Sequence, residues 1–274
     1  MKLKEITIQK KDIFDNVVPC VNVSNLVPGI TAYIRLKDEG ETLESSLKSI
    51  LGLFDHYVVI IQPSTDETVD IVKNVFENYP CTLVHYPVNS WPNGPGYDKQ
   101  DELSFKSRTY FYNYGCQFIP TTHAMKWDGD MVASNGLIDI LKQWKNIKKD
   151  YVIMKGVECA DGCCSLVNDR VYTGSEIRIF KLREKNFTNG NQCELLSVYK
   201  DNFVKKIVRK LSTLTVNDAC YYHFKYAKLE SSRSKAWPEN WEELDHFRNL
   251  ANYKVIKNST CLLELTETVL RNEK

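Results

Sequence analysis

Hydrophobic and polar positions follow two different spacings along the first half of the chain. Short apolar runs at residues 29–34 and 57–61 alternate with segments whose apolar residues recur at helical intervals. Similar runs follow at residues 81–86 and 123–127. This order of strands and helices predicts an α/β fold with a mostly parallel central sheet flanked by helices. Ligands of such sheets bind at the carboxyl ends of the strands.

Helices are predicted between and after these strands, over residues 43–54, 64–76, 106–112 and 135–145. Ser64 and Glu67 have the spacing of a capping box, which predicts that the second helix begins there. Further strands are predicted at residues 151–157 and 171–182. Beyond about residue 203 the chain is charged and is predicted to be helical.

The balance of positive and negative side chains argues against partners that are bound through a large basic surface. Lys and Arg total 36 against 35 Asp and Glu, a net charge of +1. A nucleic-acid binder or a polybasic membrane anchor would show a basic excess. No run approaches the roughly 20 apolar residues of a membrane span, and no signal peptide is indicated. We therefore predict a cytoplasmic protein without nucleic-acid partner or transmembrane segment, and leave peripheral membrane contact open.

The nine cysteines are odd in number and scattered along the chain. The tightest group, Cys159, Cys163 and Cys164, lacks the second pair that a zinc site requires. We interpret the cysteines as structural thiols of a reducing compartment.

The strongest chemical signal is the pair Asp128 and Asp130, which follows the fourth predicted strand. Residues two apart in extended structure point the same way. Two carboxylates at the carboxyl edge of a sheet suit Mg²⁺ or Mn²⁺, which could neutralise a diphosphate. The alternative is an ordinary Asp-Gly turn.

Several motifs in order along the chain resemble those of the family 2 glycosyltransferases, which have the GT-A fold. The first strand and its turn, IRLKDEG at residues 34–40, resemble a "KNEE"-like turn, and the STDET segment at 64–68 resembles part of "VVDDGSTDGT". Ser107, Arg108 and Asn113 resemble the family's "aRN" stretch, and Asp128 and Asp130 its DxD motif. Departures are Gln62, where an acidic residue is usual, and Cys193, where His is usual.

This resemblance implies a GT-A domain with a helical C-terminal extension. It divides the chain into an N-terminal arm (1–29), a catalytic domain (30–225) and a helical tail (226–274). Within the catalytic domain, residues 30–133 form the nucleotide-binding half and residues 134–225 the acceptor half. The implied activity is metal-dependent, inverting transfer of a sugar from a nucleotide-diphosphate sugar to a hydroxyl of a glycan or other acceptor.

The resemblance also assigns residues to the nucleotide sugar. It places Arg35, Glu39 and Gln62, with Ser64, near the base and ribose, and Arg108 near a phosphate. Asp128 would face the ribose or the metal.

For the metal, Mn²⁺ or Mg²⁺, the implied ligands are Asp128, Asp130 and His223. His223 lies among aromatic residues near the C-terminal end of the domain, where many GT-A enzymes bring a His to the metal or diphosphate.

The general base is expected to be a carboxylate. Glu194 falls on the Glu of the family's "g.vHE.l" pattern, and Asp161 and Glu158 are the alternatives after the fifth strand.

Other nucleotide-binding classes lack their signatures. The chain has neither GxGxxG after its first strand nor a GxxxxGK[ST] loop. A phosphatase of the haloacid dehalogenase type would need its DxD near the N-terminus and Thr where Val132 stands. The Gly-rich first loop of a sugar nucleotidyltransferase is missing. The remaining alternative is a catalytically degenerate GT-A relative that binds carbohydrate or nucleotide or acts as a scaffold. The sequence does not assign an oligomeric state.

Overall fold

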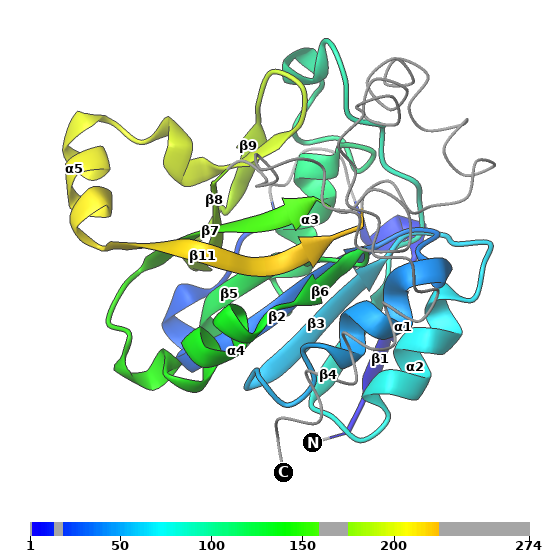
Figure 1. Cartoon of the computed structure of the whole chain (residues 1–274). Coiled ribbons are helices and arrows are strands. Elements are labelled where there is room, and N and C mark those ends of the chain that lie inside the picture. The colour runs from blue at the N-terminus through cyan, green and yellow to red at the C-terminus, as the bar shows by residue number, and fades with distance from the viewer. Residues whose placement is uncertain (1, 14–18, 159–174, 225–274) are drawn as a thin grey trace, which may run out of the picture.

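A large, mostly parallel sheet forms the centre of the molecule in a computed structural model, which describes residues 2–13, 19–158 and 175–224 (Figure 1). Its strand order is β1-β4-β3-β2-β5-β8-β7-β11-β6. The five strands from β1 to β5 are parallel to one another, β8 is antiparallel to both its neighbours, β7 and β11 are parallel, and β6 is an antiparallel edge. The strands are β1 (Lys4–Thr7), β2 (Val27–Leu36), β3 (His56–Ile61), β4 (Cys81–His85), β5 (Thr121–Asp128), β6 (Met131–Ala133), β7 (Tyr151–Glu158), β8 (Glu176–Lys181) and β11 (Thr213–His223).

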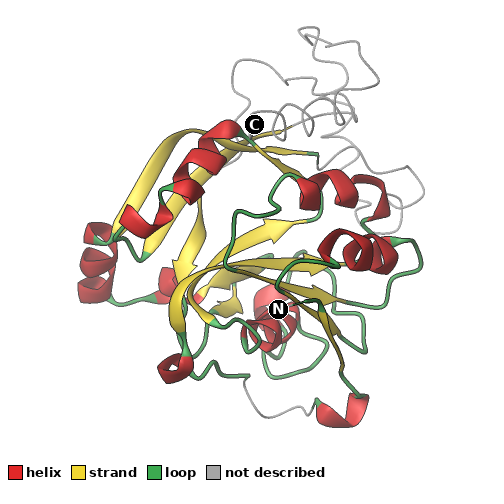
Figure 2. Ribbon diagram, turned by 90° about the horizontal axis from the view of Figure 1, so that it is seen from below, coloured by secondary structure: helices red, strands yellow, loops and turns green. Residues whose placement is uncertain are grey.

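Helices cover both faces of this sheet (Figure 2). On one face α1 (Gly40–Lys48), α2 (Thr68–Phe76) and α4 (Asn135–Lys142) pack against apolar side chains of the strands. On the other face lie α3 (Arg108–Cys116) and a small sheet of β9 (Phe187–Asn189) and β10 (Glu194–Leu196). Burial on both faces explains why β3 is an unbroken apolar run. The other described elements are the helix α5 (Phe203–Leu211) and the 3₁₀ helices Lys10–Asp12, Val23–Asn25, Tyr97–Lys99, Trp144–Asn146 and Ser197–Lys200.

The α/β order predicted from the sequence is confirmed, but helix bounds differ, and residues 49–54 lie outside α1. The second helix begins at Thr68, with Glu67 as its N-cap, and not at Ser64. The Ser64 hydroxyl accepts a hydrogen bond from the Asp38 amide at 3.1 Å and donates to the Gln62 carbonyl, also at 3.1 Å. Ser64 therefore joins two loops and does not cap the helix.

The region after residue 203 is only partly helical, so that prediction is wrong for residues 213–223. These residues form β11, which pairs with β7 in parallel and with β6 in antiparallel register. Its β-branched and aromatic residues favour a strand. The tail 226–274 lies outside the described residues, and part of the arm 1–29 forms β1 at the edge of the main sheet. None of the helices in the described ranges combines the length and hydropathy that crossing a bilayer requires.

Candidate active site

The turn that follows β5 is fixed by side chains of α1. The Thr42 hydroxyl donates to the carbonyl of Gly129 at 3.1 Å, and the Ser46 hydroxyl donates to the carbonyl of Asp128 at 3.2 Å. Ser46 also accepts a hydrogen bond from the indole nitrogen of the fully buried Trp127 at 3.0 Å. The backbone that carries the two aspartates is therefore anchored to the core and to a helix.

Glycine is required at the centre of this turn by close packing. A Cβ atom on Gly129 would lie 2.9 Å from Leu36 Cδ2 and 3.0 Å from Glu39 Cγ. These distances are shorter than ordinary van der Waals contacts. The absence of a side chain lets the Asp-Gly-Asp turn lie against the end of β2 and the loop that follows it.

Asp128 is held between two arginines from neighbouring strands. Arg35 in β2 is its partner in the parallel register, and its Nη2 donates to Asp128 Oδ1. Arg178 in β8 donates from Nη1 to Oδ2 at 2.9 Å. Burial alone would raise the pKa of Asp128, but the positive charges of Arg35 and Arg178 hold it well below its usual range. Asp128 is therefore a carboxylate whose charge is already balanced by guanidinium groups.

The contacts continue as a chain of alternating charges. Arg178 also pairs with Glu176 through Nη2, and Glu176 Oε2 lies 2.9 Å from the Lys126 amine. Together with Arg35 and Asp128, these side chains comprise three cations and two carboxylates. With Asp130 in the adjacent turn, the carboxyl ends of β2 and β5 and the amino end of β8 thus carry three cations and three carboxylates, which are closely paired.

Arg178 is further fixed by Tyr221 of β11. Its Nε donates to the Tyr221 hydroxyl at 3.2 Å, and its guanidinium lies 4.7 Å from the centre of the tyrosine ring. Gly156 lies opposite Tyr221 in the β7–β11 register, and a Cβ atom on Gly156 would come within 2.1 Å of the tyrosine ring. The close approach of these two strands therefore holds the ring against Arg178.

Asp130 and His223 are brought together by the end of β11. The amide of Phe224 donates to the Asp130 carbonyl at 2.8 Å, and His223 lies opposite Met131 in the β11–β6 register. His223 Nε2 lies 3.4 Å from Asp130 Oδ1. Carboxylate oxygen and imidazole nitrogen are both ligands of Mn²⁺-type cations.

A divalent cation fits this pair if other ligands complete its coordination. Among the described residues no group of three or more His, Cys, Asp and Glu side chains could hold a metal ion. Mg²⁺ in nucleotide sites is commonly bound by one or two carboxylates together with substrate phosphates and water. Asp130 supplies one such carboxylate and His223 a nitrogen ligand, whereas both oxygens of Asp128 already accept hydrogen bonds from arginines.

Gln62, at the carboxyl end of β3, has a fixed amide orientation. Its Oε1 accepts hydrogen bonds from the Ser90 amide at 2.7 Å and from the Ser90 hydroxyl at 3.1 Å. Because a backbone amide can only donate, the oxygen of Gln62 must face Ser90. The nitrogen of the side chain is thus the end left for a further partner, and it offers two donors.

The loops after β2 and β3 are tied to each other by several hydrogen bonds. Asp38, with a left-handed φ of 50°, accepts from the Thr65 amide at 2.7 Å. The Glu39 amide donates to Thr68 Oγ1 and the Gly40 amide to Asp66 Oδ2, each at 2.8 Å. The polar residues of the STDET segment therefore join the two loops to each other.

Arg108, at the start of α3, shares a tyrosine with Arg35. Arg108 Nη2 donates to the Tyr112 hydroxyl at 2.9 Å, and the Arg35 guanidinium lies 4.3 Å from the centre of the Tyr112 ring. Two cations thus contact one aromatic residue, which separates them and fixes their positions.

Glu194 of β10 lies beside these arginines. Its Oε2 is 3.7 Å from Arg108 Nε, and both atoms are buried without a hydrogen-bond partner in the described part of the chain. Such a pair, close but unsatisfied, is unusual in a protein interior. It is what a polar group of a substrate could complete.

Of the other carboxylates expected here, Asp161 lies outside the described residues. Glu158 ends β7 opposite His223 in the register. The contacts of Glu176 with Lys126 and Arg178 were not expected, nor were those of Tyr112 with two arginines. The signal for the β8 pair is the spacing Glu176–Ile177–Arg178, which places two charges on one face of a buried strand.

Comparison with known proteins identifies relatives of this chain. A family model described as beta-1,4-N-acetylgalactosaminyltransferase (CgtA) matches residues 21–157, half of the chain. No curated protein matches the sequence.

Among solved structures, TarS of S. aureus is 15% identical over 88% of this chain and 42% of its own, with a TM-score of 0.42. Residues 1–349 of TarS in complex with UDP-GlcNAc are 15% identical over 88% of this chain and 71% of their own length, with a TM-score of 0.45. Glucosyl-3-phosphoglycerate synthase of Mycobacterium tuberculosis, in complex with Mg²⁺ and UDP, is 15% identical over 48% of this chain and 44% of its own, with a TM-score of 0.32. The chain thus spans less than half the length of the full TarS structure.

The family match covers both loops that join at Asp38, the whole of α3 and the turn from Asp128 to Asp130. It ends within β7, before Arg178, Glu194 and His223. Because this match spans half of the chain, the chain belongs to the CgtA family of glycosyltransferases.

Proposed function

We propose that this protein transfers a sugar, N-acetylgalactosamine being the one that the family description names, from its UDP derivative to a hydroxyl of a glycan acceptor. The observation that carries the proposal is the meeting of Asp130 and His223, 3.4 Å apart, beside the arginine-bound Asp128. A pair of cation ligands at the carboxyl ends of parallel strands suits a nucleotide diphosphate.

The side chain of Gln62 suits a nucleotide base that carries a carbonyl group. Its amide nitrogen can donate to a carbonyl oxygen such as those of uracil, whereas its oxygen is occupied by Ser90. Asp128, with its charge balanced by two arginines, is suited to accept a hydrogen bond from a neutral hydroxyl such as those of ribose.

A divalent cation held by Asp130 and His223 would stabilise the negative charge that develops on the leaving diphosphate. Arg108 can add a donor from its buried Nε, which lacks a hydrogen-bond partner among the described residues. Since Arg35 and Arg178 are committed to Asp128, their role is to orient that carboxylate.

Glu194 is our candidate for the general base. It is a partly buried carboxylate in the same region as Arg108, and its Oε2 has no hydrogen-bond partner in the described residues. A base that removes the proton of the acceptor hydroxyl as the C–O bond forms leads to inversion at the anomeric carbon. A β linkage, as in the family description, follows by inversion from an α-linked UDP-sugar.

The test measures UDP release from UDP-N-acetylgalactosamine, UDP-N-acetylglucosamine and UDP-glucose, with Mn²⁺ and a panel of glycan acceptors. Asp130→Asn should lower kcat/KM by roughly 100-fold or more, about 2.7 kcal/mol of transition-state stabilisation. Asp70→Asn, at an exposed carboxylate on α2, is the matched control. Full activity in excess EDTA, or in Asp130→Asn, would disprove the metal-dependent mechanism.

Glu194→Gln tests the base separately, with Glu184→Gln as the exposed control. The loss expected for a general base is roughly 10²–10⁴-fold in kcat, with UDP affinity little changed. Proton NMR of the product reports its anomeric configuration, and a retained configuration contradicts the assignment.

The second candidate function is nucleotide binding without transfer. It is favoured by the double arginine contact to Asp128, which leaves Asp130 and His223 as the cation ligands. UDP binding measured by calorimetry, with no UDP release from any donor in the panel, would establish this alternative.

A further inference from the structure

The helix α5 (Phe203–Leu211) exposes the side chains that a helix normally buries. None of its residues is buried, and Phe203 and Leu211 keep 76% and 74% of their surface exposed. Its other large apolar residues, Val204, Val208 and Ile207, are at least 47% exposed. A helix of nine residues is marginal in water unless its apolar face is packed. The described part of the chain leaves Phe203, Ile207 and Leu211 exposed, and Val204 and Val208 border a groove.

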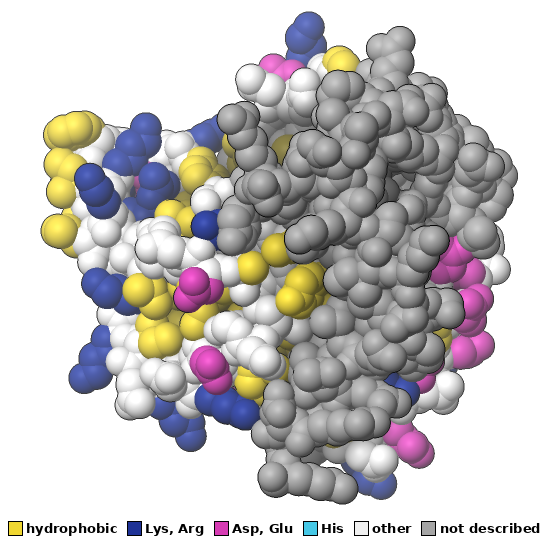
Figure 3. All heavy atoms as spheres, viewed as in Figure 1, with side chains coloured by type: hydrophobic (Ala, Val, Ile, Leu, Met, Phe, Trp, Pro, Cys, Tyr) yellow, Lys and Arg dark blue, Asp and Glu magenta, His cyan; other side chains and the backbone are white. Residues whose placement is uncertain are grey.

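The sequence of α5 is strictly divided between apolar and cationic residues. Its apolar residues lie at positions 203, 204, 207, 208 and 211, a spacing that gathers them on one side of a helix. The remaining residues, Lys205, Lys206, Arg209 and Lys210, are all cations. The local charge of +4 is concealed by the net charge of +1 of the whole chain. Figure 3 shows hydrophobic and basic side chains gathered next to each other over α5.

The helix has a capped first turn and is attached to the body by polar contacts of Leu211 and Arg209. Asn202 caps the first turn by accepting from the Lys205 amide at 3.0 Å, and Lys149 donates to the Leu211 carbonyl at 3.0 Å. Arg209 donates to the carbonyl of Val198.

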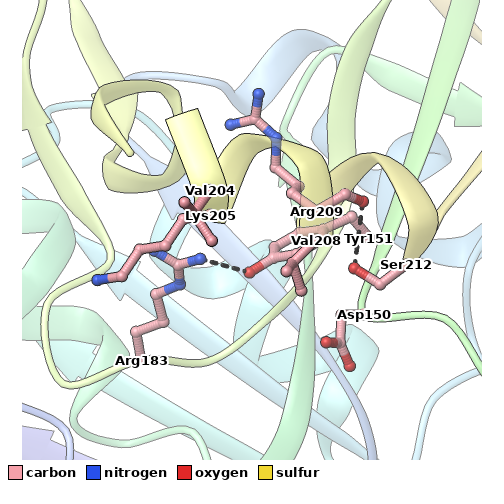
Figure 4. Close-up of a pocket in the computed structure, with 8 residues that line it drawn as sticks. All are labelled: Asp150, Tyr151, Arg183, Val204, Lys205, Val208, Arg209 and Ser212. Atoms are coloured by element: carbon pink, nitrogen blue, oxygen red, sulfur yellow. Dashed lines mark hydrogen bonds between the residues drawn. The ribbon is translucent and has the colours of Figure 1, made fainter. Parts of the chain in front are cut away.

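Between α5 and the start of β7 lies an open groove of about 330 Å³ (Figure 4). Its lining includes Val204 and Val208 of α5, and Arg183, which is bound to both carboxylate oxygens of Asp201. The helix therefore projects from the domain, as Figure 1 also shows.

We propose that α5 docks the protein on the surface of a membrane that contains anionic lipids. A short helix with one apolar face, a Lys- and Arg-rich polar face and low overall hydrophobicity lies in the interface between head groups and acyl chains. Phe203, Ile207 and Leu211, which do not line the groove, enter the acyl boundary, and the cations of α5 meet the negative surface potential. The absence of any acidic residue from α5 favours an anionic lipid surface over a protein groove with mixed charge.

This docking leaves the candidate active site accessible. The helix α5 directly precedes β11, and His223 ends that strand. Eleven residues of strand span roughly 35 Å at about 3.3 Å per residue. The membrane contact is thus separated from the Asp130–His223 pair by the length of β11, and the inference does not depend on the proposed activity.

Co-sedimentation of the full chain with vesicles tests the proposal. Vesicles of phosphatidylcholine with one third phosphatidylglycerol should bind the protein, and vesicles of phosphatidylcholine alone should bind it at least tenfold less. The variant Lys205→Glu with Lys206→Glu should lower the partition coefficient for anionic vesicles at least tenfold, because each interfacial cation contributes substantially to such binding. Phe203→Ser with Ile207→Ser should weaken binding to a similar degree.

The matched control is Lys10→Glu with Lys11→Glu, which changes the net charge equally at two exposed lysines far from α5 in the chain. Equal loss in both charge variants would mean that overall charge, and not α5, governs binding, and would overturn the proposal. So would undiminished binding of the Phe203→Ser, Ile207→Ser variant with an unchanged melting temperature. The proposal is also overturned if the wild type does not bind vesicles but forms a dimer, and the Phe203→Ser, Ile207→Ser variant is monomeric. The apolar face of α5 would then be a protein interface.

Discussion

Arg178 in β8 donates from Nη1 to Oδ2 of Asp128 in β5 at 2.9 Å, although 50 positions separate the two residues in the chain. The same guanidinium pairs with Glu176 and contacts Tyr221. One buried cation therefore connects the turn after β5 with β8 and β11, the two strands that complete the candidate site.

Replacing Arg178 should destabilise the fold strongly. Arg178→Met leaves Glu176 and Asp128, each about one third exposed, with one cation each, and losing a hydrogen bond to a charged group costs roughly 1.5–3 kcal/mol. We expect a loss in this range for the free energy of unfolding, measured by urea denaturation. Lys48→Met, which removes an exposed pair with Glu44 on α1, should cost less than about 0.5 kcal/mol. A loss below 1 kcal/mol in Arg178→Met would show that the charge chain contributes little to stability.

The lowered pKa of Asp128 predicts how the free energy of unfolding changes at acidic pH. Because Arg35 and Arg178 lower this pKa in the folded state, the stabilisation is present above the pKa of the unfolded chain, about 3.9. It is lost as the pH falls through the folded-state value. Asp128→Asn should therefore flatten the decrease in unfolding free energy below about pH 4, relative to wild type. Equal slopes in the two proteins, or no difference from an Asp70→Asn control, would contradict this.

The parallel half of the sheet and its chemical edge could be predicted because their signals are local. The apolar runs that became β2, β3, β4 and β5 are long enough to identify as strands, and Asp128 ends the last of them. Once these strands are parallel neighbours, a polar residue near the end of β2 must lie close to the end of β5. The Arg35–Asp128 contact follows from that register.

The remaining half of the site depends on pairings that no local pattern contains. Arg178 reaches Asp128 because β8 pairs in antiparallel register between β5 and β7. His223 reaches Asp130 because β11 lies between β7 and β6. The region of β11 was predicted to be helical from its charge, whereas its long-range pairing with buried strands determined its structure. The prediction of His223 as a site residue came from the family resemblance and not from the residue pattern.

Gln62→Glu tests how the nucleotide base is recognised. The substitution keeps an oxygen for Ser90 and replaces the donor nitrogen with a second, negatively charged acceptor. If the nitrogen donates to a carbonyl oxygen of uracil, Kd for UDP should rise at least tenfold, about 1.4 kcal/mol, in isothermal titration. Gln62→Met, which keeps the length without polarity, should weaken binding less because it adds no repulsion. Tighter UDP binding by Gln62→Glu would show that the site prefers the acidic residue usual in family 2.

His223→Ala tests whether this residue holds a cation together with Asp130. Removing one of two protein ligands should raise the Mn²⁺ concentration for half-maximal activity at least tenfold, while saturating Mn²⁺ should restore much of kcat. Direct titration of Mn²⁺ by electron paramagnetic resonance, in the presence of UDP, should show the same weakening without reliance on turnover. His85→Ala, on β4 beside Glu5, is the matched control and should leave both measurements unchanged. If Mn²⁺ affinity is unaltered in His223→Ala while kcat falls, the imidazole contacts the diphosphate and not the metal, because only a ligand's removal changes the affinity for the ion.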